Sequence, residues 1–194
     1  MSNPYRKPDA WSQRAKDEGY AARSVYKLDE IDRRVRLFRR GQRVLDLGCA
    51  PGSWSQYAIE RIGKEGTLVG VDLTPVSLPG GTFLEASILD IPADLLRGHL
   101  GGPADAVISD MAPLTMGARD ADHFAQIELV RCAFERATEL LKPGGVFVAK
   151  VFEGPDAKAL ELDVKKRFTE TRRIRPEAVR ANSREWFLVA IGRK

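Results

Sequence analysis

The sequence predicts an α/β protein with a mostly parallel, seven-stranded sheet and helices on both faces. Short apolar segments that read as buried strands alternate with helical patterns, and this alternation is typical of parallel strands joined by helical crossovers. Two further apolar runs, residues 171–174 and 186–191, follow near the C-terminus with a turn-like segment, Arg180–Ser183, between them. They predict an antiparallel hairpin that closes one edge of the sheet.

Five of the expected strands precede this hairpin, at residues 42–47, 67–71, 82–84, 106–109 and 145–151. Apolar residues at helical spacing predict a helix over residues 127–141 that stops at the turn Lys142–Gly145. A second set at the same spacing, within residues 22–35, predicts a basic helix that leads into the domain.

The size and composition of the chain indicate one domain over residues 1–194. With 43% hydrophobic content, a chain of 194 residues is long enough to bury a single core. No segment is long and apolar enough to cross a membrane, and the N-terminus has no signal-peptide core, so we expect a cytoplasmic protein with no membrane partner. The scattered cysteines (Cys49, Cys132) and histidines (His99, His123) predict neither a disulfide scaffold nor a metal site.

The charges are unevenly distributed along the chain, whose net charge is +4. Residues 1–43 carry 12 Lys/Arg against 6 Asp/Glu, residues 44–141 carry 6 against 14, and residues 142–194 carry 13 against 7. Basic ends around an acidic centre suit a protein that holds a polyanion outside and a cationic or hydroxyl-rich small molecule inside. A solvated surface with chance clustering explains the same counts equally well.

The turn after the first strand contains the most distinctive motif, D-x-G-x-x-P-G, at Asp46–Gly52. Ligands of open α/β sheets bind beyond the carboxyl ends of the strands, so a site is expected at this turn. Gly48 and Gly52 let the backbone approach a ligand, and Pro51 makes the bend rigid. The spacing differs from the G-x-G-x-x-G of dinucleotide-binding proteins and resembles the first motif of methyltransferases. Trp54, just after it, is by itself more typical of a core aromatic.

Two carboxylates further along the chain are candidate adenosine contacts. Asp72 ends the second strand, where a carboxylate can accept hydrogen bonds from both ribose hydroxyls of an adenosine. Asp90 follows the third strand, where the adenine edge is expected. An aspartate before Ile91-Pro92 also reads as a helix cap, so that alternative stays open for Asp90.

Six segments in order resemble the FtsJ/RrmJ family of ribose 2′-O-methyltransferases. They are A-K-D-E-G-Y-A-A-R-S-V-Y-K-L-D-E-I at 15–31, D-L-G-C-A-P-G-S-W at 46–54, V-D-L at 71–73, S-D-M-A-P at 109–113, A-K-V-F at 149–152 and N-S-R-E-W-F at 182–187. The resemblance implies the Rossmann-like fold of class I methyltransferases. It also implies a basic helical extension at residues 1–40 and a cofactor-binding and catalytic core at residues 41–194.

The same resemblance implies roles for individual residues and molecules. The implied cofactor is S-adenosyl-L-methionine, and its expected contacts are Gly52, Trp54, Asp72, Asp90 and Asp110. The family's catalytic tetrad falls on Lys27, Asp110, Lys150 and Glu185. The implied substrate is a uridine of large-subunit (23S) ribosomal RNA, with the large ribosomal subunit as partner. We expect the protein to act as a monomer. Two positions depart from the family pattern, Ser53 for a glycine and Leu114 for an asparagine, and Leu114 puts fine substrate specificity in question more than chemistry.

The chemistry of methyl transfer agrees with these roles. A ribose hydroxyl is a poor nucleophile, whereas a sulfonium methyl is already activated, so the enzyme mainly aligns the reacting atoms and removes a proton. A lysine removes a proton only when it is neutral, and burial or a second ammonium lowers its ordinary pKa of about 10.4. We therefore expect Lys150, at the end of an apolar strand, to be the general base, oriented by Asp110 near the sulfonium. Lys27 and Glu185 are expected to place the hydroxyl.

Other interpretations remain open. Without the resemblance, Lys27 and Glu185 read as surface charges, and Asp110 as the start of a turn. Amino-directed base methyltransferases resemble one another in a D/N-P-P-aromatic element, which residues 110–113 lack, and cytosine C5 enzymes need a cysteine nucleophile, for which neither cysteine is well placed. A tRNA ribose methyltransferase and a non-catalytic RNA-binding ribosome-assembly factor with the same fold are the remaining alternatives.

Two basic clusters are candidate RNA contacts, because Lys and Arg bind phosphate and aromatic rings stack on exposed bases. The first lies between Arg6 and Arg40, and its aromatic residues are Tyr5, Trp11, Tyr20 and Tyr26. The second comprises Lys165–Arg167 and Arg172–Arg175. Packing of the N-terminal helix on the domain explains Tyr26 at least equally well.

Overall fold

The structure, a computed structural model, describes residues 9–113 and 119–194, with only the backbone described for residues 119–122. Seven strands and six helices lie in these residues. The strands are β1 (Arg43–Leu47), β2 (Thr67–Asp72), β3 (Thr82–Glu85), β4 (Ala104–Ser109), β5 (Leu141–Phe152), β6 (Phe168–Ile174) and β7 (Glu185–Arg193). The helices are α1 (Ala10–Asp17), α2 (Val25–Val35), α3 (Ser53–Ile62), α4 (Ala93–Leu100), α5 (Arg119–Leu140) and α6 (Ala157–Arg167).

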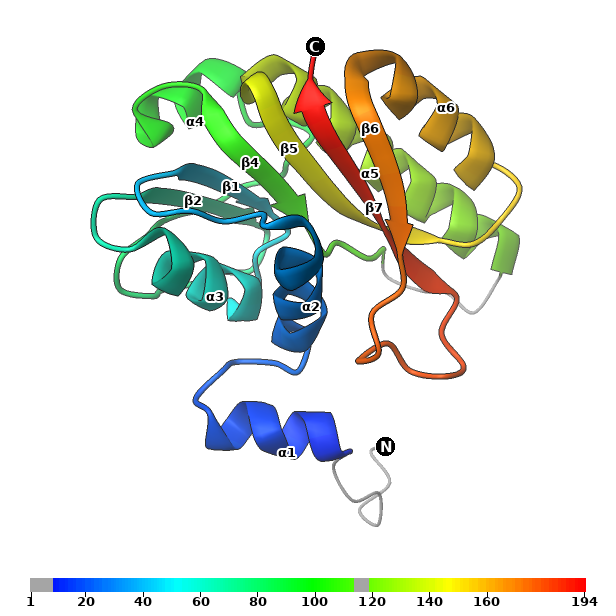
Figure 1. The fold of residues 1–194 in the computed structure, drawn as a ribbon, viewed down its shortest axis with the longest axis horizontal. Helices are drawn as coiled ribbons and strands as arrows, with labels where there is room; N and C mark the ends of the chain where they lie inside the picture. Colours follow the sequence, from blue (N-terminus) through cyan, green and yellow to red (C-terminus); the bar gives the residue numbers. More distant parts are fainter. Residues whose placement is uncertain (1–8, 114–118) are drawn as a thin grey trace.

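The strands form one sheet in the order β3-β2-β1-β4-β5-β7-β6 (Figure 1). The five strands from β3 to β5 pair in parallel, and β7 pairs antiparallel with both β5 and β6. The predicted fold class is therefore confirmed, including the late hairpin. β6 and β3 are the two edge strands, while β7 lies inside the sheet between β5 and β6.

Two boundaries differ from the sequence-based expectation. The basic helix α2 begins at Val25 rather than near residue 22, since the chain from Gly19 to Ser24 forms turns. Helix α5 ends at Leu140, and the turn expected at residues 142–145 is already part of β5, where Leu141 pairs with Ala104. An irregularity in the register between Ala104 and Ala106 accommodates the extra length of β5.

Helices cover both faces of the sheet because neighbouring strand residues point in opposite directions. Leu45 of β1 packs in a core with α4, α5 and α6, whereas the preceding Val44 packs in a second core with α1, α2 and α3. The central strands are thus buried on both faces, as parallel sheets usually are. Among the described residues, no helix combines the length and apolar character that a membrane span needs.

The topology brings several chain segments to one edge of the sheet. Parallel strands end at the same edge, so the residues after β1, β2, β4 and β5 meet there. β7 runs in the opposite direction and therefore begins at this edge, where Glu185 pairs with Phe152. The fold alone thus places Asp72, Asp110, Lys150 and Glu185 on one side of the molecule.

Candidate active site

A pocket of about 520 Å3 lies at the carboxyl ends of β1, β2 and β4. Its volume is within the range of roughly 300–1,000 Å3 that is common for small-molecule sites. The glycine of the first turn is needed here, because Gly48 has φ +76° and an added Cβ would come within 2.1 Å of the Met111 side chain. The lining residues are Gly48, Ala50, Asp72, Leu73, Thr74, Ala86, Ser87, Ile88, Leu89, Asp110, Met111, Ala112, Pro113 and Leu129.

Asp72 ties two turns of this pocket together. One carboxylate oxygen accepts a hydrogen bond from the Ala50 amide at 2.9 Å, and the other accepts from the Thr74 amide at 2.8 Å. A carboxylate has about four acceptor positions, so both oxygens can still accept from ligand hydroxyls. The predicted adenosine-binding carboxylate is thus part of the pocket wall.

Asp46 is a buried carboxylate that the sequence interpretation treated only as part of the turn. Its side chain is 1% exposed, and the Ser55 hydroxyl donates to its Oδ2 at 2.6 Å, whereas Oδ1 is buried with no hydrogen-bond partner among the described residues. Burial raises the pKa of Asp46 to about 7 against the Ser55 hydrogen bond, and the charges of Asp110 and Asp72 raise it further. Three neighbouring carboxylates favour a cationic ligand.

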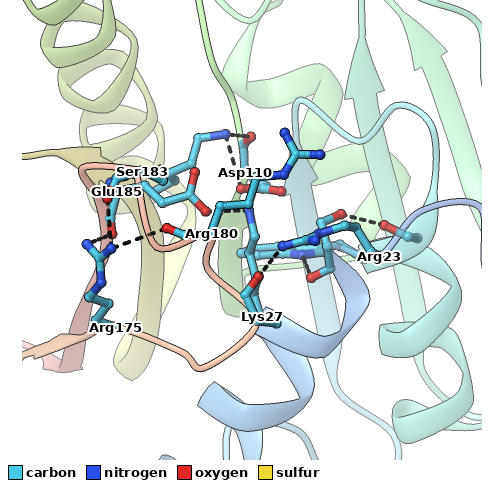
Figure 2. Close-up of polar contacts among 12 residues, drawn as sticks. Arg23, Lys27, Asp110, Arg175, Arg180, Ser183 and Glu185 are labelled. Carbon is cyan, nitrogen blue, oxygen red and sulfur yellow. Dashed lines mark hydrogen bonds and ion pairs between the residues drawn. The ribbon is translucent and has the colours of Figure 1, made fainter. Parts of the chain in front are cut away.

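The four residues of the expected catalytic tetrad form two ion pairs. The Nζ of Lys150 donates to the backbone carbonyl of Asp110 at 2.6 Å and lies 3.2 Å from Asp110 Oδ1, and the lysine side chain is 8% exposed. The Nζ of Lys27 lies 2.5 Å from Glu185 Oε1. Figure 2 shows Lys27, Asp110 and Glu185 converging from α2, from the segment after β4 and from the start of β7.

The two pairs belong to one cluster. Lys150 lies opposite Phe187, and Phe152 lies opposite Glu185, so Lys150 and Glu185 are diagonal neighbours on the same face of the sheet. Burial raises the pKa of Glu185, but the charge and hydrogen bond of Lys27 together with the charge of Lys150 outweigh burial, and the pKa lies below its usual value. The structure therefore brings together all four residues that the resemblance indicated.

Trp54 and Ser53 hold α2 against α3. The indole Nε1 of Trp54 donates to the Ser24 carbonyl at 2.9 Å, and its ring packs 5.7 Å from that of Phe187. The Ser53 hydroxyl lies 2.8 Å from the Ser24 hydroxyl, so the serine at this departure from the family pattern makes a partly buried contact of its own. Both contacts fix the start of α2, one turn before Lys27.

The remaining predicted cofactor contacts lie beside the pocket lining or outside it. Trp54 is 3% exposed in the core, and Gly52 has φ +111° with its Cβ position blocked by Leu78 at 2.8 Å. Neither residue lines the pocket, so cofactor contact by either residue stays a prediction.

Asp90 is exposed, directly after the lining residues Ser87–Leu89. The alternative of a helix cap at Asp90 is wrong, because the N-cap of α4 is Pro92. Leu114 lies outside the described residues.

Two positioning residues were missed by sequence reasoning. Gln126 of α5 is fully buried and donates to the Lys150 carbonyl at 2.7 Å. The guanidinium of Arg175 donates to the carbonyls of Ser183 at 2.7 Å, Glu185 at 3.2 Å and Arg180 at 3.4 Å, so it holds the loop before β7 (Figure 2). A polar residue in the otherwise apolar helix pattern was the available signal for Gln126, whereas Arg175 looked like any other basic residue.

The structure changes the interpretation of the basic clusters. In the second cluster, nearby carboxylates pair with Lys165, Lys166, Arg172 and Arg173 at 2.6–3.2 Å.

In the first basic cluster, Tyr26 is 6% exposed, its ring packs 5.1 Å from the Trp11 ring, and its hydroxyl donates to Glu18. The packing alternative therefore holds for Tyr26. Tyr5 lies outside the described residues.

The sheet order, the glycine turn and the acidic pocket next to the Lys150–Asp110 ion pair define a Rossmann-like enzyme of the methyltransferase class. The sequence model of the FtsJ-like methyltransferase family matches residues 20–193. The chain therefore belongs to the FtsJ-like methyltransferase family.

Similar proteins agree with this membership. The chain is 49% identical over 195 residues to the ribosomal RNA large subunit methyltransferase E of Sorangium cellulosum, which covers 99% of this chain and 91% of the relative. It is 42% identical to the protein of the same name from Bdellovibrio bacteriovorus, over 98% of this chain and 99% of the relative. A crystal structure from Plasmodium falciparum, described as a ribosomal RNA methyltransferase, has a TM-score of 0.79 at 25% identity and covers 90% of this chain and 98% of its own.

Proposed function

We propose that this methyltransferase uses S-adenosylmethionine to methylate a ribose 2′-hydroxyl, on a uridine of large-subunit ribosomal RNA, and that it acts as a monomer. The observation that carries the proposal is the convergence of the Lys150–Asp110 and Lys27–Glu185 pairs next to an acidic pocket. The names of the relatives supply the large-subunit RNA as the substrate class.

The pocket residues fit this cofactor. The carboxylates of Asp72 and Asp110 line the pocket, and their charges reach the buried Asp46, whose Oδ1 has no hydrogen-bond partner among the described residues. Together the three carboxylates provide a negative environment for a sulfonium and an ammonium. Asp72 has acceptor positions for ribose hydroxyls, and Gly48, whose missing side chain lets Met111 pack against the turn, lines the same pocket. When bound, S-adenosylmethionine supplies a methyl group on a positively charged sulfur, which is activated for attack by oxygen.

The tetrad residues then have complementary tasks. Asp110 holds the Lys150 amine through two oxygens, so the amine is fixed at the end of β5. In its neutral form, Lys150 takes the proton from the 2′-hydroxyl as the oxygen receives the methyl group. Lys27 donates to the hydroxyl oxygen, and Glu185 orients Lys27 through their ion pair, so the single hydroxyl proton is left directed at Lys150.

Mass spectrometry of nucleosides tests the proposal. Intact large subunits, free 23S rRNA and tRNA are incubated separately with the enzyme and cofactor carrying an isotope-labelled methyl group. The expected product is labelled 2′-O-methyluridine from the large-subunit RNA. Labelled ribose in tRNA alone would indicate the tRNA alternative, a labelled base would contradict ribose chemistry, and no label in any substrate would favour the non-catalytic assembly factor.

A further inference from the structure

A basic cleft of about 740 Å3 opens between α1 and the loop that joins β6 to β7. Three cationic side chains line it, Lys16 from α1, Arg23 from the segment before α2, and Arg180 from the β6–β7 loop. None of its other lining residues is acidic. Lys16 and Arg180 are exposed, so the cleft presents positive charge to solvent.

One carboxylate reaches these cations from outside the lining. Oδ2 of Asp9 forms an ion pair with Arg23 and lies 3.9 Å from the Arg180 guanidinium, while Oδ1 accepts from the Ser12 amide at 2.9 Å. The Asp9 side chain is 40% exposed. A single, half-exposed anion thus occupies the space between two guanidinium groups from distant parts of the chain.

The cleft is close in sequence and in space to the residues that we assign to the acceptor hydroxyl. Arg23 lies in the turn just before α2, the helix that carries Lys27, and Arg180 lies in the loop that leads into Glu185. The Arg23 guanidinium also donates to the Ala178 carbonyl, which joins the two segments. The cleft therefore lies on the two chain segments that lead into Lys27 and Glu185.

The other basic cluster differs from this cleft. Carboxylates on the same helix or strand pair with Lys165, Lys166 and Arg172. Such pairs are local, and none of these residues lines the cleft. The cations of the cleft come from three segments, and Asp9 is the carboxylate that the structure places against two of them.

We propose that this cleft binds a backbone phosphate of the substrate RNA next to the acceptor nucleotide, and that Asp9 occupies the phosphate position until RNA displaces it. The inference rests on the proposed function, because it takes RNA as the substrate. Carboxylate and phosphate oxygens compete for the same guanidinium donors. The Asp9 side of the ion pair is 40% exposed and therefore screened by solvent, so the loss of the Asp9 contact costs little when a phosphate replaces it.

The substitution Asp9→Asn separates this competition from an anchoring role. Asparagine caps a helix as well as aspartate does, so the substitution keeps the contact with Ser12 and removes only the charge. Competition predicts tighter RNA binding by the variant, whereas an anchor for α1 predicts unchanged or weaker binding. Asp17→Asn is the matched control, since Asp17 is an exposed carboxylate on the same helix that accepts from Gln13.

The measurement is the Kd of in vitro transcribed 23S rRNA by filter binding. We expect Asp9→Asn to bind about two- to fivefold more tightly than the wild type, the range that an exposed ion pair supports, and Asp17→Asn to show less than half of that gain. Arg180→Gln should weaken binding and reduce the gain from Asp9→Asn in the double variant. If the Asn variant unfolds at a lower temperature than the wild type, Asp9→Ser, which also caps the helix, takes its place.

Equal Kd values for Asp9→Asn and Asp17→Asn, or weaker binding by Asp9→Asn, would overturn the inference. A wild-type protein that neither binds nor methylates large-subunit RNA would instead overturn the proposed function. If the wild-type protein methylates the RNA normally and Asp9→Asn leaves the Kd unchanged, only the inference of competition at the cleft is overturned.

Discussion

The side-chain amide of Gln126 takes the place of a neighbouring strand at Lys150. Its Nε2 donates to the Lys150 carbonyl at 2.7 Å, and its Oε1 accepts from the Phe152 amide at 3.2 Å. β4 pairs with β5 only as far as Ser109 opposite Ala149, so the last residues of β5 lack a strand on that side. Gln126 satisfies these backbone groups and keeps the strand extended under the proposed general base.

Replacing Gln126 with Leu should therefore impair catalysis more than binding. The change leaves a buried carbonyl and a buried amide without partners, each at a cost of about 1–3 kcal/mol, and lets Lys150 shift. We expect a lower melting temperature and a kcat reduced about tenfold or more, with the KM for RNA nearly unchanged. Gln13→Leu on the exposed face of α1 is the control. An unchanged kcat and an unchanged pH profile of kcat would contradict the positioning role.

Lys150→Met should remove methyl transfer and leave cofactor binding intact. Loss of a general base lowers rates by roughly 10²–10⁴-fold, while the pocket carboxylates remain in place. Turnover and calorimetric binding of the cofactor measure the two effects. Lys142→Met provides the control, since Lys142 lies on the same strand and pairs with Asp105 on the surface. Near-normal turnover of Lys150→Met would rule out Lys150 as the base.

Arg175→Met should loosen the loop that carries Glu185. The substitution removes a guanidinium that donates to the carbonyls of Arg180, Ser183 and Glu185, so the Lys27–Glu185 pair loses its support on one side. We expect kcat/KM for RNA to fall about tenfold, with cofactor affinity unchanged and partial recovery in Arg175→Lys. Arg172→Met, which removes an exposed arginine paired with Glu170, should behave like the wild type. Equal activity of the Arg172 and Arg175 variants would refute this role.

Cofactor binding should strengthen as the pH rises through 7. Burial raises the pKa of Asp46 to about 7, so the free protein holds a proton there below that pH, whereas a cationic cofactor favours the ionised carboxylate. Binding then releases a proton, and affinity increases up to about tenfold per pH unit below 7. Calorimetry at several pH values, in buffers with different ionisation enthalpies, measures both effects. Asp46→Asn should flatten the pH dependence; a flat profile for the wild type would contradict the assignment.

The Asp46 carboxyl also affects folding, and the stability of the cofactor-free protein should fall with rising pH, whereas cofactor affinity rises. The folded state holds the Asp46 proton more tightly than the unfolded state, whose pKa is near 3.8. The stabilising contribution is therefore present below that pH and is lost as the pH rises through about 7. Chemical unfolding of the cofactor-free protein between pH 5 and 8 should show a decline in the free energy of unfolding that is smaller in Asp46→Asn.

The fold followed from the sequence because its signals are local. Buried strands, the glycine turn at residues 46–52 and the helix periodicity depend on neighbouring residues, and these elements lie where they were expected. The boundary of α5 was less accurate, since the pairing of Leu141 with Ala104 continues β5 through a segment that reads as a turn. Pairing with a distant strand decided that case.

The sequence by itself determined the fold class, the cofactor turn and, through its resemblance, the four residues of the tetrad. Only the tertiary structure decided how Lys27 meets Glu185, because this contact depends on the register of β7 against β5 and on the packing of α2 against α3. It also separated basic residues paired with local carboxylates from those that line a cleft. A sequence does not show where a charged side chain points or which group it pairs with. After folding, the distance to other charges and the burial of the side chain set its electrostatic energy.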